Sequence, residues 1–214
     1  FTDCDRVVLH NISLVNSPDW TMLFRRSQEL LLEDLTVYGD SRWPNNDGVD
    51  FESCTDVKIV SSWFDVGDDG IVFSSGNTNP QRVPFVPQPP PPTKNVIGRN
   101  LRIRSHSSAI KFEAIFATNH SDISDVHFEN VEIYNSSRGI GFQQRTGSGN
   151  IFNITFDNVS ISTMYPTGNN WWGSGEPIWI TNVAEHDADH DHALGQADNN
   201  KKQKQEKKRI NTDA

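Results

Sequence analysis

The sequence contains few cations, few cysteines and no long apolar run. No segment approaches the ~20 apolar residues that a transmembrane helix needs, which argues against a membrane partner. The 19 lysine and arginine residues are outnumbered by 28 acidic ones, and the net charge of -9 argues against a nucleic-acid partner, because phosphate binding requires clustered cations. The hydrophobic fraction is only 35%, yet Phe 12 and Trp 6 provide bulk for a core. We expect a soluble monomer.

The chain begins at Phe1 and contains no signal peptide, so we interpret it as a mature or truncated product. Its Asn-x-Ser/Thr sequons suit a protein secreted by a eukaryotic cell. The sequons lie at Asn11, Asn119, Asn135, Asn153 and Asn158. The alternative is that these asparagines occupy β-turns. We predict an extracellular protein.

An eight-residue pattern of apolar side chains recurs along the chain. Its first, third, sixth and eighth residues are apolar, with exceptions at Ser62 and Gly98. The copies begin, in steps of 23, 27, 39, 30 and 28 residues, at Val7, Leu30, Val57, Val96, Val126 and Ile154. Such alternation predicts short strands, and helical spacing is absent. One coil of these strands cannot bury its apolar face alone, so the coils must stack.

A second motif follows each copy of the first at a steady distance. It ends at Phe24, Phe51, Phe73, Phe112, Phe142 and Ile180. Leucine-rich repeats are the main alternative at this period, but their Leu/Asn signature is missing. We therefore predict an all-β solenoid. The chain enters a coil directly at Phe1 without a cap, so we expect the N-terminal coils of the solenoid to be missing.

The two cysteines share one phase of the repeat. Cys4 and Cys54 each precede a copy of the pattern by three residues, and Ser27 holds this position in the coil between them. Adjacent strands are about 4.8 Å apart, so two coil spacings exceed comfortable disulfide reach. We predict two free, buried thiols.

Two segments depart from the repeat. Residues 77–93 form an insertion with a proline run, which cannot join a sheet and predicts a projecting loop. Residues 184–214 contain a His/Asp-rich and a Lys/Gln-rich stretch without apolar periodicity, which predicts a disordered tail. The solenoid domain is therefore assigned to residues 1–183.

Three aspartates lie just before neighbouring copies of the second motif. Asp47 and Asp69 are 22 residues apart, one coil without insertion, so about one strand spacing separates their backbones, and Asp68 is adjacent. Close carboxylates repel one another, which raises one pKa and places a protonated acid beside an ionised base. Glycosidic cleavage requires this combination. The alternative is that Asp-Gly pairs mark solvent-facing turns.

The residues around these aspartates resemble two motifs of glycoside hydrolase family 28, the polygalacturonases and their relatives. Residues 45–50 read NNDGVD, similar to the family's NTDG[IV]D, and residues 67–72 read GDDGIV, similar to its GDDC[IV]A. The resemblance implies a right-handed parallel β-helix and inverting hydrolysis, with Asp68 as general acid and with Asp47 and Asp69 activating water. Inversion predicts carboxyl groups about 6.5–9.5 Å apart.

The chain departs from the family at two further motifs. The histidine of its Gly-His-Gly motif is replaced by Ser108, and His106 is a candidate substitute. Its Arg-Ile-Lys motif, which holds the substrate carboxylate in polygalacturonases, aligns with residues 141–143, where both cations are missing. The candidates to replace these cations are Lys111, Arg138 and Arg145.

A tryptophan pair provides further candidates for sugar binding. Residues 171–177 read WWGSGEP, and adjacent tryptophans in a Gly-rich loop are suited to stacking on sugar rings. Trp171 and Trp172 would stack, and Glu176 would accept hydrogen bonds from sugar hydroxyls. The alternative is an aromatic cap over the last coil.

The predicted function is hydrolysis of a pectin-like polysaccharide without a metal or other cofactor. One alternative is a polysaccharide lyase on the same scaffold, in which clustered aspartates bind Ca²⁺ and a basic residue removes a proton. Another is a carbohydrate-binding β-helix without catalytic activity.

Overall fold

The computed structural model describes residues 1–75, 91–114, 121–144, 149–164 and 173–182. These residues form β-strands and no helix, so none of them belongs to a helix able to cross a membrane. The strands are β1 (Asp5–His10), β2 (Ser13–Val15), β3 (Leu23–Arg25), β4 (Gln28–Glu33), β5 (Thr36–Tyr38), β6 (Val49–Glu52), β7 (Thr55–Val60), β8 (Trp63–Val66), β9 (Ile71–Ser74), β10 (Thr93–Ser105), β11 (Ser108–Ala114), β12 (Ile123–Ser136), β13 (Arg138–Gln144), β14 (Ile151–Thr163) and β15 (Glu176–Asn182).

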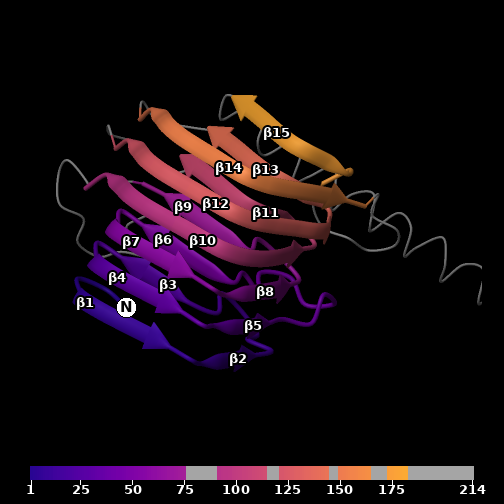
Figure 1. Cartoon of the computed structure of the whole chain (residues 1–214), viewed down its shortest axis with the longest axis horizontal. Helices are drawn as coiled ribbons and strands as arrows, with labels where there is room; N and C mark the ends of the chain where they lie inside the picture. The colour runs from indigo at the N-terminus through magenta and orange to yellow at the C-terminus, as the bar shows by residue number, and fades with distance from the viewer. Residues whose placement is uncertain (76–90, 115–120, 145–148, 165–172, 183–214) are drawn as a thin grey trace, which may run out of the picture.

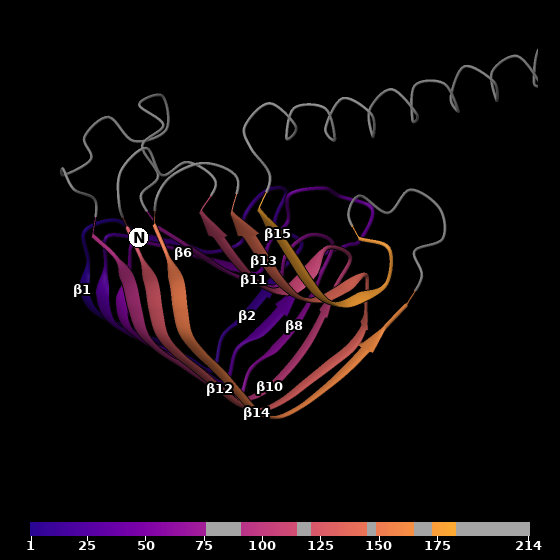
Figure 2. The same cartoon turned by 90° about the horizontal axis from the view of Figure 1, so that it is seen from above.

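The strands form two parallel sheets that wind around a common core (Figure 1). One sheet has six strands in the order β15-β13-β11-β9-β6-β3. The other has nine strands and is sharply bent when seen from above (Figure 2). β10 runs through this bend as one strand and pairs with β7 along its first part and with β8 along its last part. The predicted all-β parallel solenoid is confirmed.

The pairing register reproduces the predicted repeat. The first residues of the apolar pattern are consecutive partners, namely Val7, Leu30, Val57, Val96, Val126 and Ile154. The last residues of the second motif are also consecutive partners, namely Phe24, Phe51, Phe73, Phe112, Phe142 and Ile180. Coils of unequal length therefore keep one register.

Residues with positive φ turn the chain at fixed points of each coil. One set of equivalent positions comprises Asn11, Asp34, Ser61, Asn100, Asn130 and Asn158. Asparagine adopts this left-handed region more readily than most residues. At this corner the Asn158 side chain donates to Asn130 at 2.6 Å, and Asn130 donates to Asn100 at 3.3 Å. Of the sequon residues, Asn11 lies in a bend after β1, whereas Asn158 is a positive-φ residue within β14.

The core contains a column of stacked phenylalanine rings beneath the six-stranded sheet. The rings belong to Phe1, Phe24, Phe51, Phe73, Phe112 and Phe142. Successive centroids are 4.6 to 5.5 Å apart, close to the spacing of adjacent strands. Phe73 also meets the edge of Phe128, from the nine-stranded sheet, at 6.0 Å. The column thus follows from an aromatic residue at one phase of successive coils.

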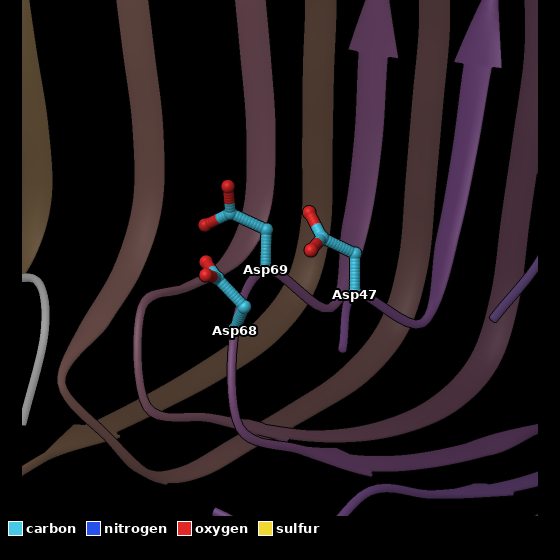
Figure 3. A group of neighbouring side chains, drawn as sticks. All are labelled: Asp47, Asp68 and Asp69. Carbon is cyan, nitrogen blue, oxygen red and sulfur yellow. The ribbon is translucent and has the colours of Figure 1, made fainter. Parts of the chain in front are cut away.

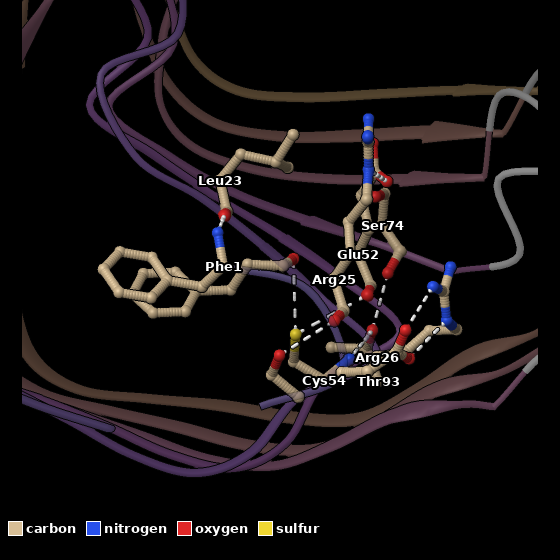
Figure 4. Close-up of polar contacts among 11 residues, drawn as sticks. Phe1, Leu23, Arg25, Arg26, Glu52, Cys54, Ser74 and Thr93 are labelled. Atoms are coloured by element: carbon tan, nitrogen blue, oxygen red, sulfur yellow. Dashed lines mark hydrogen bonds and ion pairs between the residues drawn. The ribbon is translucent and has the colours of Figure 1, made fainter. Parts of the chain in front are cut away.

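Both cysteines are free, but only Cys54 is buried. Its thiol contacts the Phe24 carbonyl at 3.4 Å (Figure 4), and burial raises the pKa of Cys54 to about 12. Cys4 is only half-buried, so the prediction of two buried thiols is wrong for this residue. Cys4 lies in the first coil of the stack, which packs against a neighbouring coil on one side only.

The two segments outside the repeat fall largely beyond the described residues. The described chain is interrupted at residues 76–90, and the predicted tail, 184–214, lies outside it altogether. The insertion was placed at 77–93, but Thr93 is the first residue of β10 and is buried, which corrects this boundary. The Thr93 hydroxyl donates a hydrogen bond to the Ser74 carbonyl, which links the start of β10 to the end of β9.

Candidate active site

Asp47, Asp68 and Asp69 lie together where two neighbouring coils enter the six-stranded sheet. Asp47 precedes β6, and Asp68 and Asp69 precede β9, its partner strand. The three side chains point to the same side (Figure 3), and one oxygen from each lies within 4.8 Å of the other two. All three residues are buried. The structure therefore brings together the three residues that the coil phase selected.

Asn46 joins the two turns that carry the aspartates. Its Oδ1 accepts the Gly67 N–H at 2.8 Å, and its Nδ2 donates to the Asp40 carbonyl at 3.0 Å. The Asn45 N–H donates to Asp68 Oδ2 at 3.1 Å. Asn46 is fully buried, so its side chain holds the turns in place rather than contacting solvent.

Glycine follows the aspartate on each of these two coils and permits their close approach. A Cβ at Gly48 would lie 2.4 Å from the Gly70 carbonyl oxygen, and a Cβ at Gly70 would lie 2.5 Å from that of Ala109. Carbon atoms essentially never come this close to backbone oxygens without displacement. The spacing of the catalytic candidates therefore depends on these glycines.

Asp69 is surrounded by groups that stabilise its ionised form. Its Oδ1 accepts a hydrogen bond from the Ser108 N–H at 2.8 Å, and its Oδ2 accepts one from Lys111 Nζ at 2.7 Å. The Ser107 hydroxyl also hydrogen-bonds to this carboxylate. Burial raises the pKa of Asp69, but Lys111 and these donors outweigh burial and leave the pKa below its ordinary value. Asp69 is therefore ionised at neutral pH.

The pKa values of Asp68 and Asp47 are raised, whereas that of Asp69 is lowered. Burial, reinforced by the charge of Asp69, raises the pKa of Asp68 to about 7. Burial, followed by the charge of Asp50, also raises the pKa of Asp47 well above its ordinary value. Asp47 Oδ1 has no hydrogen-bond partner among the described residues. The cluster thus contains the pairing that acid/base hydrolysis requires, a protonated acid beside an ionised base.

The nearest oxygens of the three carboxyl groups, one from each residue, lie within 4.8 Å of one another. The predicted separation of about 6.5–9.5 Å refers to whole carboxyl groups and stays a prediction. Two hydrogen bonds of about 2.8 Å from one water span about 4.6 Å at the tetrahedral angle, so a single water fits between two of these oxygens. The same three oxygens could also ligate a cation, although Ca²⁺ takes about six to eight oxygen ligands.

Comparison with known proteins gives matches to one family of glycoside hydrolases. The model of the family described as "Glycosyl hydrolases family 28" matches residues 1–85. A probable polygalacturonase of Vitis vinifera is 29% identical over 168 residues, which cover 76% of this chain and 33% of the relative. Exopolygalacturonase B of Aspergillus niger is 26% identical over 166 residues, which cover 73% of this chain and 34% of the relative. The chain is therefore similar to glycoside hydrolase family 28 in its first 85 residues and to polygalacturonases over about three quarters of its length. It spans about a third of the length of these relatives.

Solved structures agree with this chain in fold. The crystal structure of an exopolygalacturonase from Thermotoga maritima gives a TM-score of 0.60 at 22% identity, over 85% of this chain and 40% of that one. The endo-xylogalacturonan hydrolase of Aspergillus tubingensis gives a TM-score of 0.62 at 15% identity, over 84% of this chain and 44% of that one. These neighbours are right-handed β-helices, so the predicted handedness is confirmed.

The residues predicted to bind substrate lie in different surroundings. His106 is buried after β10, where its Nε2 lies 3.0 Å from Arg104 Nη2. Lys111 is ion-paired with two carboxylates, since its Nζ lies 2.7 Å from both Asp69 and Glu113.

The remaining candidates lie toward β15 or outside the described residues. Arg138 Nε lies 3.3 Å from Glu176 Oε2, and the Arg138 guanidinium lies over the Trp179 ring at 3.9 Å from its centroid. Arg138 and Glu176 are register partners, so the structure brings these two candidates together. Arg145, Trp171 and Trp172 fall outside the described residues.

Sequence reasoning did not identify three neighbours of the aspartate cluster, namely Asp50, Ser107 and Glu113. Asp50 and Lys111 hold the same register position two strands apart, which was visible in the sequence. Burial and the charges of Glu113 and Asp69 raise the pKa of Asp50 well above its ordinary value. Glu113 lies two residues after Lys111 on the same face of β11, a period-two signal that could have indicated this ion pair.

Proposed function

We propose that this chain carries the catalytic cluster of a glycoside hydrolase that cleaves a pectin-like polysaccharide of the polygalacturonase type outside the cell, acting as a monomer. The observation that supports the proposal most strongly is the buried pairing of Asp68, whose pKa is about 7, with ionised Asp69. The family match of residues 1–85 and the names of the polygalacturonase relatives point to the same chemistry.

In the proposed mechanism each aspartate has a separate role. Asp68 donates its proton to the glycosidic oxygen as that bond breaks. Asp69, which is ionised, accepts a proton from the attacking water. Asp47 provides a second hydrogen-bond partner for this water, since one of its oxygens lies within 4.8 Å of an oxygen of Asp69, a spacing that one water can bridge. Attack from the face opposite the leaving group inverts the anomeric centre.

The reaction is tested by the products that the wild-type chain releases from pectic polysaccharides. We expect new reducing ends with inverted configuration, followed by proton NMR, and undiminished activity in the presence of a chelator. Retention of configuration would contradict the proposed mechanism. An unsaturated product absorbing in the ultraviolet would instead indicate a lyase, which needs a basic residue. Burial lowers the pKa of Lys111, but Asp69 and Glu113 outweigh burial and keep this lysine protonated.

The pH dependence follows from the proposed acid. Only protonated Asp68 can donate, so kcat/KM should fall as the pH rises through about 7, by about tenfold per pH unit beyond it. The lowered pKa of Asp69 keeps the base ionised well into the acidic range. A profile of kcat/KM against pH checks this prediction, and a rate that increases steadily above neutrality would contradict the assignment of the acid.

A further inference from the structure

The outer face of the six-stranded sheet near the aspartate cluster is rich in carboxylates. Asp50, Val72 and Lys111 form one row of register partners across β6, β9 and β11. Two positions further along the same strands, the row consists of Glu52, Ser74 and Glu113. With Asp47, Asp68 and Asp69 at the entrance to these strands, the site is surrounded mainly by acidic side chains.

Each described cation on this face is already paired with a carboxylate. Lys111 Nζ lies 2.7 Å from both Asp69 and Glu113. Arg25 is ion-paired with Glu52 through its Nε (Figure 4). Arg138 is paired with Glu176 and covers the ring of Trp179. Among the residues that the structure describes here, no cation is left to pair with a carboxylate of a bound sugar.

Two acceptors, by contrast, remain without partners in the described part of the face. Asp47 Oδ1 and Asp50 Oδ2 are buried and accept no hydrogen bond, and both residues are more than nine-tenths buried. Carboxyl oxygens readily accept hydrogen bonds from sugar hydroxyls. A charged sugar carboxylate at this site would lie close to the ionised carboxylate of Asp69, and Lys111, which already pairs with Asp69 and Glu113, would offer it no separate cation, which is costly in a partly desolvated site. The site therefore favours hydroxyl donors over an added anion.

We propose that the sugar unit cleaved by this chain carries no charge, so that the enzyme prefers a neutral sugar or an esterified uronate to a free uronate. This inference rests on the proposed hydrolase function. It agrees with the lack of cations at residues 141–143, the positions that align with the carboxylate-binding motif of polygalacturonases. Lys111 positions Asp69 rather than the substrate.

The test compares two polymers that differ only in charge. Highly methyl-esterified homogalacturonan and the same sample after saponification share backbone, linkage and length. A neutral galactan is assayed beside them. We expect the wild-type chain to release reducing ends at least tenfold faster from the esterified polymer or from galactan than from the saponified polymer. A saponified polymer cleaved equally fast or faster would overturn the inference and leave the hydrolase function intact. If no polymer is cleaved, both proposals fail.

A charge variant provides a second, independent measurement. Glu113→Gln removes one of the two carboxylates that neutralise Lys111, so the rate on the saponified polymer should rise several-fold relative to the esterified one. Glu132→Gln is the matched control, because Glu132 pairs with Arg102 on the nine-stranded sheet, away from the cluster. An unchanged preference in Glu113→Gln, with both polymers still cleaved, would contradict the proposed role of this charge.

Discussion

Replacing Asp68 with asparagine is expected to reduce kcat by about 10²–10⁴-fold, the usual contribution of a general acid. The amide cannot donate the proton that the leaving oxygen needs. It has nearly the same shape as the carboxyl group, so the hydrogen bond from the Asn45 N–H to this side chain can be retained. The measurement is reducing-end release from the polymer that the wild-type chain cleaves best, together with KM. We expect KM to change little, because the proton transfer is made in the transition state.

Asp157→Asn is the matched control for this experiment. Asp157 is an exposed aspartate on β14, far in the fold from the cluster, and its replacement should leave both kcat and the circular dichroism spectrum unchanged. If Asp68→Asn kept full activity, the assignment of the acid would be wrong. If it lost activity together with the β-sheet spectrum, the loss would reflect unfolding, and Asp69→Asn would then be compared at the same temperature.

Replacing Phe73 with alanine is expected to lower the free energy of unfolding by about 3–5 kcal/mol, the usual cost of removing a buried phenylalanine side chain. Phe73 lies at the centre of the ring column, with stacked neighbours Phe51 and Phe112 at 5.4 and 5.3 Å and Phe128 at its edge. The cavity would border coils on both sides, so neither coil can close it without losing its own register. Denaturant titration followed by circular dichroism measures this loss.

Phe152→Ala serves as the comparison for Phe73→Ala. Phe152 is 49% exposed on β14, so its removal should cost much less than a buried ring. Stacked coils can unfold in parts, so tryptophan fluorescence is recorded with circular dichroism to test whether the two transitions coincide. Equal effects of the two substitutions would contradict the view that the ring column carries much of the core.

The coil phase made the fold and the aspartate cluster predictable. Each strand begins at a fixed point of the repeat, so Asp47 and Asp69 could be placed on neighbouring coils from their 22-residue separation alone. The same phase placed Arg138 beside Glu176. Such predictions depend only on the backbone path, which the apolar pattern determines.

Properties that depend on side-chain direction could not be predicted from the coil phase. The sequence offered Lys111 to the substrate, whereas the structure pairs it with Asp69 and Glu113. Both arrangements are compatible with an outward position on β11, and the choice depends on which carboxylates lie within reach. The short distance between the nearest oxygens of the three aspartates likewise depends on the close approach of coils at Gly48 and Gly70.

Coils of unequal length keep one register, so the segments between strands can change in length while the strands keep their positions. The step from Val57 to Val96 contains 39 residues and the step from Val7 to Leu30 only 23, yet their strands pair in the same phase. Additional residues are accommodated between strands and leave the strands in place. Loops between strands can therefore change in length without moving Asp47, Asp68 or Asp69, so under the proposed function a change of substrate would not require a change in the position of these aspartates.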